Sequence, residues 1–490
     1  MSFNLLKKDK QKKIEILLYI LTIIFLLLMA FGNFARWPIT EQLGIADNLE
    51  KYSQLYPNLN SENPYFTGGY FPGIAYFIYL LKFLIPDGII MEVLLILSVF
   101  FIIFFFHLNK KIISEIYPNN IDFSNYWLLC IIFSFWLTRS WLWYAVELKS
   151  DTIAFSLCFL AFFIAKPYKE NLKRNYFKLI FSIIIIAYAF TIKQQTIFLL
   201  FGMALYSLIN KNYFFKFYSL ITFCVAVLIY YYFYQNENLW FFTILRFSED
   251  PIYTINDWLR MHYKEMILII LFIIFILFSS FHNLCEINFR SKLNYLFSNL
   301  RSNIWFYLIF FLATTGIISS VKKGGNTGNT EIALILFFPF IYIFIHKFKK
   351  SVLIFVAYAL LIFEIQNVIH SVNEYINAKQ FQSYIKKIKE DKNKSVLTDR
   401  YTYFASRIMR KDNSIVSLTT MKTLDKYFFK KSYNKDSSNI DILHPNYEAL
   451  KRNYDYIILL GADIEKQIDK KYYIKLFSNK KGYVYKKIQQ

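Results

Sequence analysis

Long apolar runs alternate with short polar connections along most of this 490-residue chain. A helix needs about 20 mostly apolar residues to cross the hydrocarbon core of a bilayer, and shorter runs are tolerated in bundles. This criterion predicts eleven spans, at residues 14–32, 89–107, 126–138, 151–166, 177–192, 194–210, 214–234, 265–281, 303–320, 331–346 and 352–369. The pattern therefore predicts an α-helical polytopic membrane protein of about eleven transmembrane helices.

Three stretches depart from this pattern. Residues 36–72 are polar and locally acidic, within an outer loop expected at 33–88, and the amphipathic run 70–85 predicts a helix along the membrane surface. From about residue 371 the chain is polar, and short alternating segments at 395–399, 414–418, 455–463 and 475–488 predict strands, the last a hairpin. We expect a membrane domain over 1–370 and a small α/β soluble domain over 371–490.

Composition and charge support a membrane location. A chain with 56% hydrophobic and 21% aromatic residues has more apolar surface than a soluble globule can cover. The formal net charge of +22 is explained by Lys and Arg in cytoplasmic connections, which we favour over nucleic-acid binding. The basic clusters place the N-terminus in the cytoplasm and the C-terminal domain on the outer side of a plasma (inner) membrane, provided that residues 70–85 do not cross.

Ionisable groups at the ends of spans are the first candidates for chemistry, because a charge near hydrocarbon is costly unless it is paired or faces water. In this topology the outer rims collect Asp47, Glu50, Glu147, Lys149, Asp151, Lys193, Gln194, Gln195, Lys322, Lys323, Asn326, Asn329 and Glu331. A carboxylate there can act as general base on an acceptor hydroxyl, while lysines or a carboxylate-bound divalent cation hold a departing phosphate.

Each of these groups also has a plain structural explanation. Asp47 can be a solvated loop acid, the charges of residues 147–151 can pair locally at the interface, and Lys193 can be a turn lysine that extends its ammonium to water. His262 has no second ligand at metal spacing and is interpreted as a surface residue, and the four cysteines show no metal or redox spacing. No metal ligand is assigned, and a requirement for Mg²⁺ or Mn²⁺ stays open.

The order of these elements resembles the GT-C superfamily of glycosyltransferases that use polyprenyl-phosphate-linked sugars. The nearest patterns are those of protein O-mannosyltransferases, aminoarabinose-transferase-like proteins and polyprenol-phosphate-mannose-dependent mannosyltransferases. The resemblance extends over residues 14–346. It rests on Asp47 with Tyr52, Asn63-Pro64-Tyr65, Tyr70-Phe71-Pro72-Gly73, Lys149-Ser150-Asp151, Lys193-Gln194 and the stretch Gly324 to Glu331.

The resemblance implies inverting transfer of a sugar from a lipid-phosphate donor to a hydroxyl of a glycan, lipid or protein acceptor. By position, Asp47 is the expected catalytic base, with Glu50 as a second candidate, and the lipid phosphate leaves toward Lys193 and Lys149. The residues expected to bind substrate are Tyr52, Tyr70, Glu147, Lys149, Asp151, Lys193, Gln194, Arg246, Asn329 and Glu331.

Two other functions stay open. A transporter or flippase for a lipid-linked sugar or polysaccharide would place charges deep within spans and is often built from inverted repeats. An O-antigen-type polymerase or ligase would place functional arginines in a large outer loop, and Arg246 and Arg260 in the loop 235–264 fit that pattern.

Overall fold

The computed structural model describes most of the helical part of the chain and parts of the C-terminal region. The described residues are 2–34, single positions between 39 and 55, 72–86, 88–117, 121–148, 150–165, 172–237, 252–281, 303–321, 327–390, 396–398, 415–417, 455–459, 468, 470–479 and 482–488. The chain divides into two compact units. Unit 1 comprises Met1–Ala30, Val93–Tyr232 and Phe247–Ile369, and unit 2 comprises Phe31–Glu92, Phe233–Arg246 and His370–Gln490.

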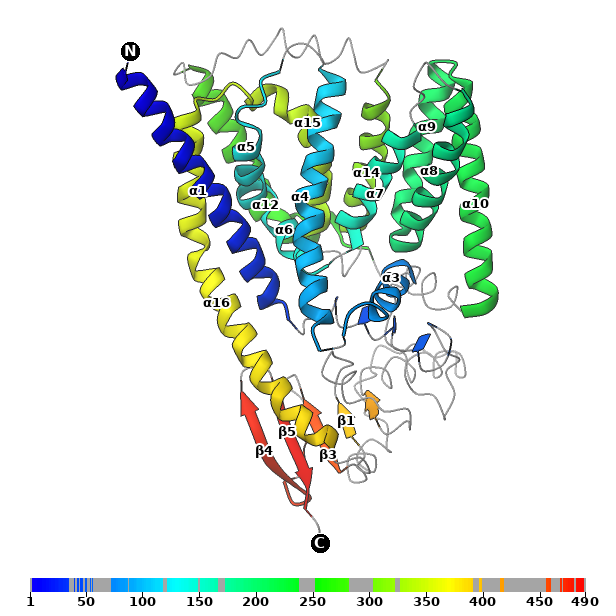
Figure 1. Cartoon of the computed structure of the whole chain (residues 1–490), viewed down its shortest axis with the longest axis vertical. Helices are drawn as coiled ribbons and strands as arrows, with labels where there is room; N and C mark the ends of the chain where they lie inside the picture. The colour runs from blue at the N-terminus through cyan, green and yellow to red at the C-terminus, as the bar shows by residue number, and fades with distance from the viewer. Residues whose placement is uncertain are drawn as a thin grey trace. The chain divides into compact units, whose positions relative to one another are not determined.

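Unit 1 is built from helices (Figure 1). They are most of α1 (Ser2–Gly32) and α4 (Ile90–Ile116), α5 (Tyr126–Ile132), the π-helix η1 (Phe133–Leu137), α6 (Arg139–Ala145), α7 (Ser150–Ala165), α8 (Leu172–Ile192), the 3-10 helix η2 (Gln194–Ile197), α9 (Phe198–Ile209), most of α10 (Tyr213–Glu237), α12 (Ile255–Phe281), α14 (Ile304–Ser320), α15 (Thr327–Ile345) and the first half of α16 (Lys350–Glu390).

Apolar helices of spanning length confirm a helical protein of membrane type. Among the described residues, four segments are long and apolar enough to cross a bilayer, namely Gln11–Gly32, Ile90–Ile116, Tyr213–Phe233 and Lys350–Tyr384. Five further apolar helices have 10–17 residues, at Ser150–Ala165, Tyr176–Ile192, Gln194–Ile209, Ile304–Ser320 and Thr330–Ile345. At about 1.5 Å per residue, these shorter helices cover less than the roughly 30 Å of the hydrocarbon core. The predicted number of eleven spans stays a prediction.

The predicted third span, residues 126–138, is followed by another helix and not by a simple connection. The chain continues past residue 138 into α6, and the segment Tyr126–Leu137 meets α6 at an angle of 100°. The bend follows the π-helix, where the backbone N–H of Thr138 donates to the carbonyl of Phe133 over 3.1 Å and Thr138 adopts φ −124° and ψ 40°. A π-turn and a residue outside the helical region interrupt the regular ladder and so allow a sharp kink.

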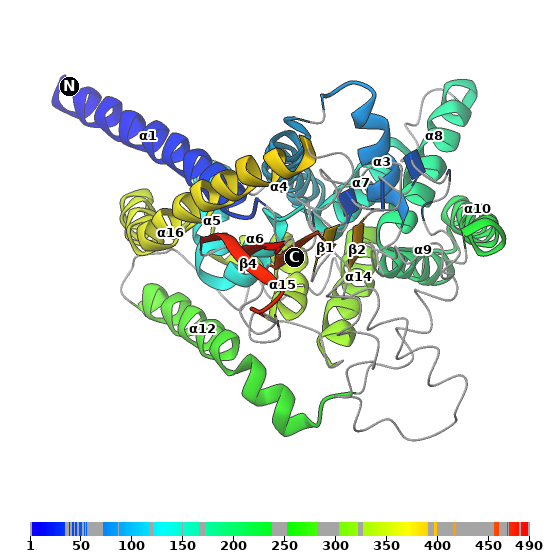
Figure 2. The same ribbon diagram turned by 90° about the horizontal axis from the view of Figure 1, so that it is seen from below.

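Close contacts between helices stabilise the part of unit 1 around Asp151 and Lys193. Helices α8, α9 and α10 lie side by side in both views (Figures 1 and 2). Gly202 of α9 allows close approach to α14, because a Cβ at this position would lie 2.7 Å from the carbonyl oxygen of Tyr307. The Ser182 hydroxyl of α8 donates to the Ala161 carbonyl of α7 over 2.7 Å. These contacts fix the relative positions of α7, α8, α9 and α14.

Unit 2 contains α3 (Pro72–Lys82), the second half of α16 and a mixed sheet. The 11-residue helix α3 confirms a helix in the run 70–85 and, at roughly 16 Å, it is too short to cross a bilayer. The sheet order is β2-β1-β3-β5-β4, from β1 (Val396–Thr398), β2 (Ile415–Ser417), β3 (Tyr456–Leu459), β4 (Tyr473–Asn479) and β5 (Gly482–Lys487).

The strands lie where the alternating segments predict them. β1 pairs in parallel with β2 and β3, whereas β5 is antiparallel to β3 and β4, so the predicted C-terminal hairpin is confirmed. Phe477 of β4 contacts Phe381 and Tyr384 of α16, with ring centroids 5.9 and 4.8 Å apart. The sheet therefore packs against the polar extension of the last long helix.

Candidate functional site

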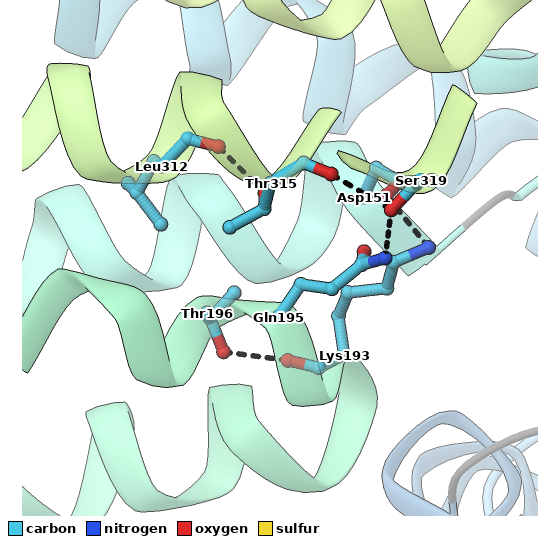
Figure 3. Close-up of polar contacts among 7 residues, drawn as sticks. All are labelled: Asp151, Lys193, Gln195, Thr196, Leu312, Thr315 and Ser319. Atoms are coloured by element: carbon cyan, nitrogen blue, oxygen red, sulfur yellow. Dashed lines mark hydrogen bonds and ion pairs between the residues drawn. The ribbon is translucent and has the colours of Figure 1, made fainter. Parts of the chain in front are cut away.

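Four polar side chains from three helices of unit 1 and one junction between helices meet in one place, and we call them the Lys193 cluster (Figure 3). Asp151 lies in the first turn of α7, Lys193 between α8 and η2, Gln195 within η2, and Ser319 near the end of α14. Lys193 Nζ lies 2.9 Å from Asp151 Oδ1. Gln195 Nε2 donates to Ser319 Oγ, which in turn donates to the Thr315 carbonyl over 2.8 Å. The cluster joins residues that are 168 positions apart in the sequence, from 151 to 319.

The chain break at Lys193 positions this cluster. Lys193 is extended (φ −146°, ψ 107°), so α8 ends at Ile192 and the chain re-enters a helix through the short 3-10 turn. The backbone of Lys193 remains satisfied, because its N–H donates to the Ala189 carbonyl and its carbonyl accepts from Thr196 N and Thr196 Oγ1 over 3.0 and 2.6 Å. The predicted polar interruption is therefore a defined turn that directs Lys193 and Gln195 toward α7 and α14.

The two charges of the cluster differ in exposure. The Asp151 side chain is 2% exposed and the Lys193 side chain is 20% exposed. Asp151 also lies at the N-terminal end of α7, where the helix dipole favours a carboxylate. The carboxylate is thus enclosed and holds the ammonium in place, while part of the ammonium remains accessible. Such a lysine, beside an amide donor, can bind an anion such as a phosphate.

The segment before α7 is buried. Glu147 and Leu148 are both almost inaccessible, and Leu148 has a positive φ of 58°, which is unusual for a residue with a branched side chain. The Ser98 hydroxyl of α4 donates to the Val146 carbonyl over 2.9 Å. Glu147, which the sequence places at an interfacial rim, is therefore inside the helical packing. Backbone strain of this kind is found at functional sites when the surroundings enforce it.

Glu331 lies in a different polar environment from the Lys193 cluster. It is 1% exposed, and its Oε2 accepts the backbone N–H of Trp141 over 2.6 Å. Trp141 lies in the first turn of α6, so this carboxylate satisfies an N–H that the helix itself leaves free. Glu331 therefore binds the first turn of α6, directly after the 100° bend. The neighbouring Asn329 belongs to α15, and its side chain is outside the described residues.

His262 is wrongly predicted as a surface residue. Its side chain is fully buried, its ring lies 4.8 Å from the ring of Trp258, and its Nδ1 lies 3.1 Å from Thr330 Oγ1. Metal-ligand spacing in the sequence does not indicate that this residue is buried. Residues 258, 262 and 265 follow helical spacing, which places Trp258, His262 and Glu265 on one face of α12. This spacing is the sequence feature that indicates burial of His262.

Glu50 belongs to unit 2, is exposed, and forms an ion pair with Lys82 of α3. Gln194 lies in η2, but its neighbour Gln195 makes the contact with Ser319. Five predicted site residues lie outside the described part of the chain, namely Asp47, Tyr52, Tyr70, Lys149 and Arg246.

The described residues contain no group of three or more His, Cys, Asp or Glu side chains that could hold a metal ion. Asp151, the carboxylate of the Lys193 cluster, is paired with an ammonium. Cys130 and Cys158 are buried, as expected for packing residues, whereas Cys224 is exposed on α10. The geometry therefore defines a lysine–carboxylate pair with a side-chain amide beside it. No protein-family model matches the chain, and no curated protein matches it either.

Proposed function

We propose that the chain is an inverting membrane glycosyltransferase with a GT-C-like membrane domain. It would move a sugar from a polyprenyl-phosphate-linked donor to a hydroxyl of a glycan, lipid or protein acceptor on the outer face of the plasma (inner) membrane. The observation that carries the proposal is the Lys193–Asp151 pair, in which an enclosed carboxylate holds a partly accessible ammonium over 2.9 Å. A lipid phosphate is an anion of the kind that this ammonium can receive.

In the proposed reaction the acceptor hydroxyl loses its proton to a carboxylate and its oxygen attacks the anomeric carbon. The bond between that carbon and the phosphate oxygen breaks, and the lipid phosphate leaves with the electron pair. Lys193 compensates the charge that develops on the leaving phosphate, and Asp151 positions Lys193 before the donor arrives. Asp47 is the proposed base, with Glu50 as the second candidate.

The Lys193 cluster provides further hydrogen-bonding capacity beside the lysine. Gln195 Nε2 has two protons and uses Ser319 Oγ as an acceptor, so a second N–H can turn to a phosphate oxygen. The proposed topology has eleven spans, the N-terminus in the cytoplasm and the C-terminal α/β domain on the outer side. In that topology the Lys193 turn and the start of α7 share the outer rim with the loop 33–88.

Binding of polyprenyl monophosphate, the proposed leaving group, tests whether Lys193 binds the phosphate. The identity of the sugar is not needed for this test. The purified full-length protein in lipid nanodiscs is titrated with a polyprenyl monophosphate, and the affinity of the wild type is compared with that of Lys193→Gln. We expect at least a tenfold loss of affinity, equivalent to about 1.4 kcal/mol. Lys216→Gln, at an exposed lysine of α10, is the matched control and is expected to bind like the wild type. Equal affinity of Lys193→Gln and wild type contradicts the proposal.

One observation favours the transporter alternative. Glu265, Glu331 and His262 are enclosed within the helical unit rather than exposed at its ends, and enclosed ionisable residues are typical of transport pathways. Reconstituted vesicles with a fluorescent polyprenyl-phosphate-linked sugar separate the two functions. Movement of the intact lipid between leaflets without sugar transfer supports transport, and release of polyprenyl phosphate supports transfer.

A further inference from the structure

Helix α12 faces the rest of unit 1 through a polar stripe. Trp258, His262 and Glu265 are spaced so that they share one face of this helix. Trp258 Nε1 donates to Ser320 Oγ of α14 over 3.0 Å, and His262 Nδ1 meets Thr330 Oγ1 of α15 at 3.1 Å. The opposite face carries exposed apolar side chains, at Tyr263, Ile267, Ile270 and Ile274. Polar contacts therefore provide much of the described attachment of α12.

Three ionisable side chains of this region are enclosed together, and we call them the His262 trio. His262, Glu265 and Glu331 are 0%, 7% and 1% exposed. Glu265 follows His262 by three residues on α12, and Thr330, the residue before Glu331, contacts His262. Among the described residues, Glu265 Oε2 and His262 Nε2 make no hydrogen bond. None of the ion pairs formed between described residues includes Glu265 or Glu331.

The neighbouring elements bring no cation to balance these acids in the described part of the chain. The sequences of η1 and α14 contain no Lys, Arg, His, Asp or Glu. In α6, Arg139 is committed to Glu364, with Arg139 Nε 2.6 Å from Glu364 Oε1. In α15, Glu331 is the acidic residue itself. With both glutamates ionised and His262 neutral, the trio has two negative charges and no positive one, which is costly in an enclosed site.

We propose that His262, Glu265 and Glu331 form a buried proton-binding site whose occupancy holds α12 against α15. One proton, taken up from water and carried by the imidazole or by a carboxylate, reduces the net charge of the trio from two negative charges to one. A second proton makes the trio neutral. The protons return to water when α12 separates, and no bond other than those to hydrogen changes. A proton is the ligand rather than a metal ion, because the described residues offer no three-ligand group.

The proton belongs to the trio rather than to one residue. A protonated His262 with two carboxylates and a neutral His262 with one protonated glutamate contain the same number of protons, so a titration reports the occupancy of the whole trio. Contact between α12 and α15 is favoured by the bound proton. Docking therefore weakens as pH rises through the range in which the trio loses this proton. The inference does not depend on the transferase proposal.

Amide hydrogen exchange of the full-length protein in nanodiscs tests the site. Protection of residues 255–265 is measured from about pH 6 to about pH 9, after correction for the intrinsic exchange rate, with α7 as internal reference. Release of one proton on undocking predicts up to a tenfold fall in protection per pH unit above the transition. Glu265→Gln is expected to remove this pH dependence, and His262→Gln provides an independent second variant.

Glu15→Gln is the matched control, since Glu15 is an enclosed carboxylate of unit 1 whose partners are Lys350 and Tyr19. This variant is expected to keep the pH profile of the wild type in α12. The proposal is overturned if wild-type protection of α12 changes less than twofold per pH unit over the range. It is equally overturned if both trio variants keep the wild-type profile, or if α7 loses protection in parallel with α12.

Discussion

The Lys193 cluster and the His262 trio are both enclosed by helices of unit 1, yet they balance charge in opposite ways. In the first, the buried Asp151 faces the ammonium of Lys193 over 2.9 Å, and the cation is the more exposed partner. In the second, two buried glutamates face a histidine, with no Lys or Arg paired to them among the described residues. The comparison shows that a buried carboxylate alone does not define a role. Its partner decides whether it positions a cation or requires a proton.

The largest expected effect comes from breaking the paired cluster on its cationic side. Lys193→Met leaves the enclosed Asp151 without its ammonium, and loss of one partner of a buried ion pair costs about 3–5 kcal/mol. Asp151→Asn should cost less, because the partly exposed Lys193 can extend to water. The double variant should recover stability relative to Lys193→Met. Thermal unfolding in detergent measures this order, and equal costs for the two single variants would show that the exposure difference is irrelevant.

An intermediate effect is expected from truncating Glu331 of the His262 trio, and a smaller one from neutralising it. Glu331→Gln weakens the interaction with the N-terminus of α6, but it also removes a like charge from Glu265. Because the two changes oppose each other, we expect a net change of no more than about 1 kcal/mol in the free energy of unfolding. Glu331→Ala should be worse, because it leaves the Trp141 N–H without an acceptor, at about 1–3 kcal/mol. A loss for Glu331→Gln as large as that for Lys193→Met would remove the distinction between the clusters.

The smallest expected effect sharpens the description of the Lys193 cluster. Ser319→Ala removes the acceptor of the Gln195 amide and should cost about 1 kcal/mol, a typical value for one hydrogen bond. Thr314→Val removes another hydroxyl of α14 that is exposed and bonded within its own helix, and it is expected to change stability little. The unfolding temperatures of the two variants should differ measurably. If they coincide, Ser319 contributes nothing beyond helix packing.

Sequence patterns predict the elements of this protein better than the contacts between them. Short segments rich in Val, Ile, Leu and Tyr predict the strands. The polar interruption at Lys193 predicts the break between α8 and η2. The bend after η1 is not predictable from apolarity, since a bent helix pair and a straight span have the same composition.

The candidate site shows the same limit. Asp151 and Lys193 are identifiable as charges at helix ends, but their pairing depends on how α7 packs against α8. The 3-10 geometry of η2 determines that Gln195, rather than the predicted Gln194, reaches Ser319. Ser319 itself lies inside an apolar run and carries no pattern that marks it. Metal-ligand spacing carries no information about the burial of His262, whereas its position on one face of α12 with Trp258 and Glu265 does.

The 100° bend between η1 and α6 also bears on whether the chain crosses the bilayer an odd or an even number of times. A helix pair that continues past its bend to the far leaflet adds one crossing, and a pair that returns adds none. With the other predicted spans unchanged, eleven crossings leave the two termini on opposite sides of the bilayer, and ten leave them on the same side. The backbone at Thr138 thus determines whether tags at the two ends of this protein report from one compartment or from two.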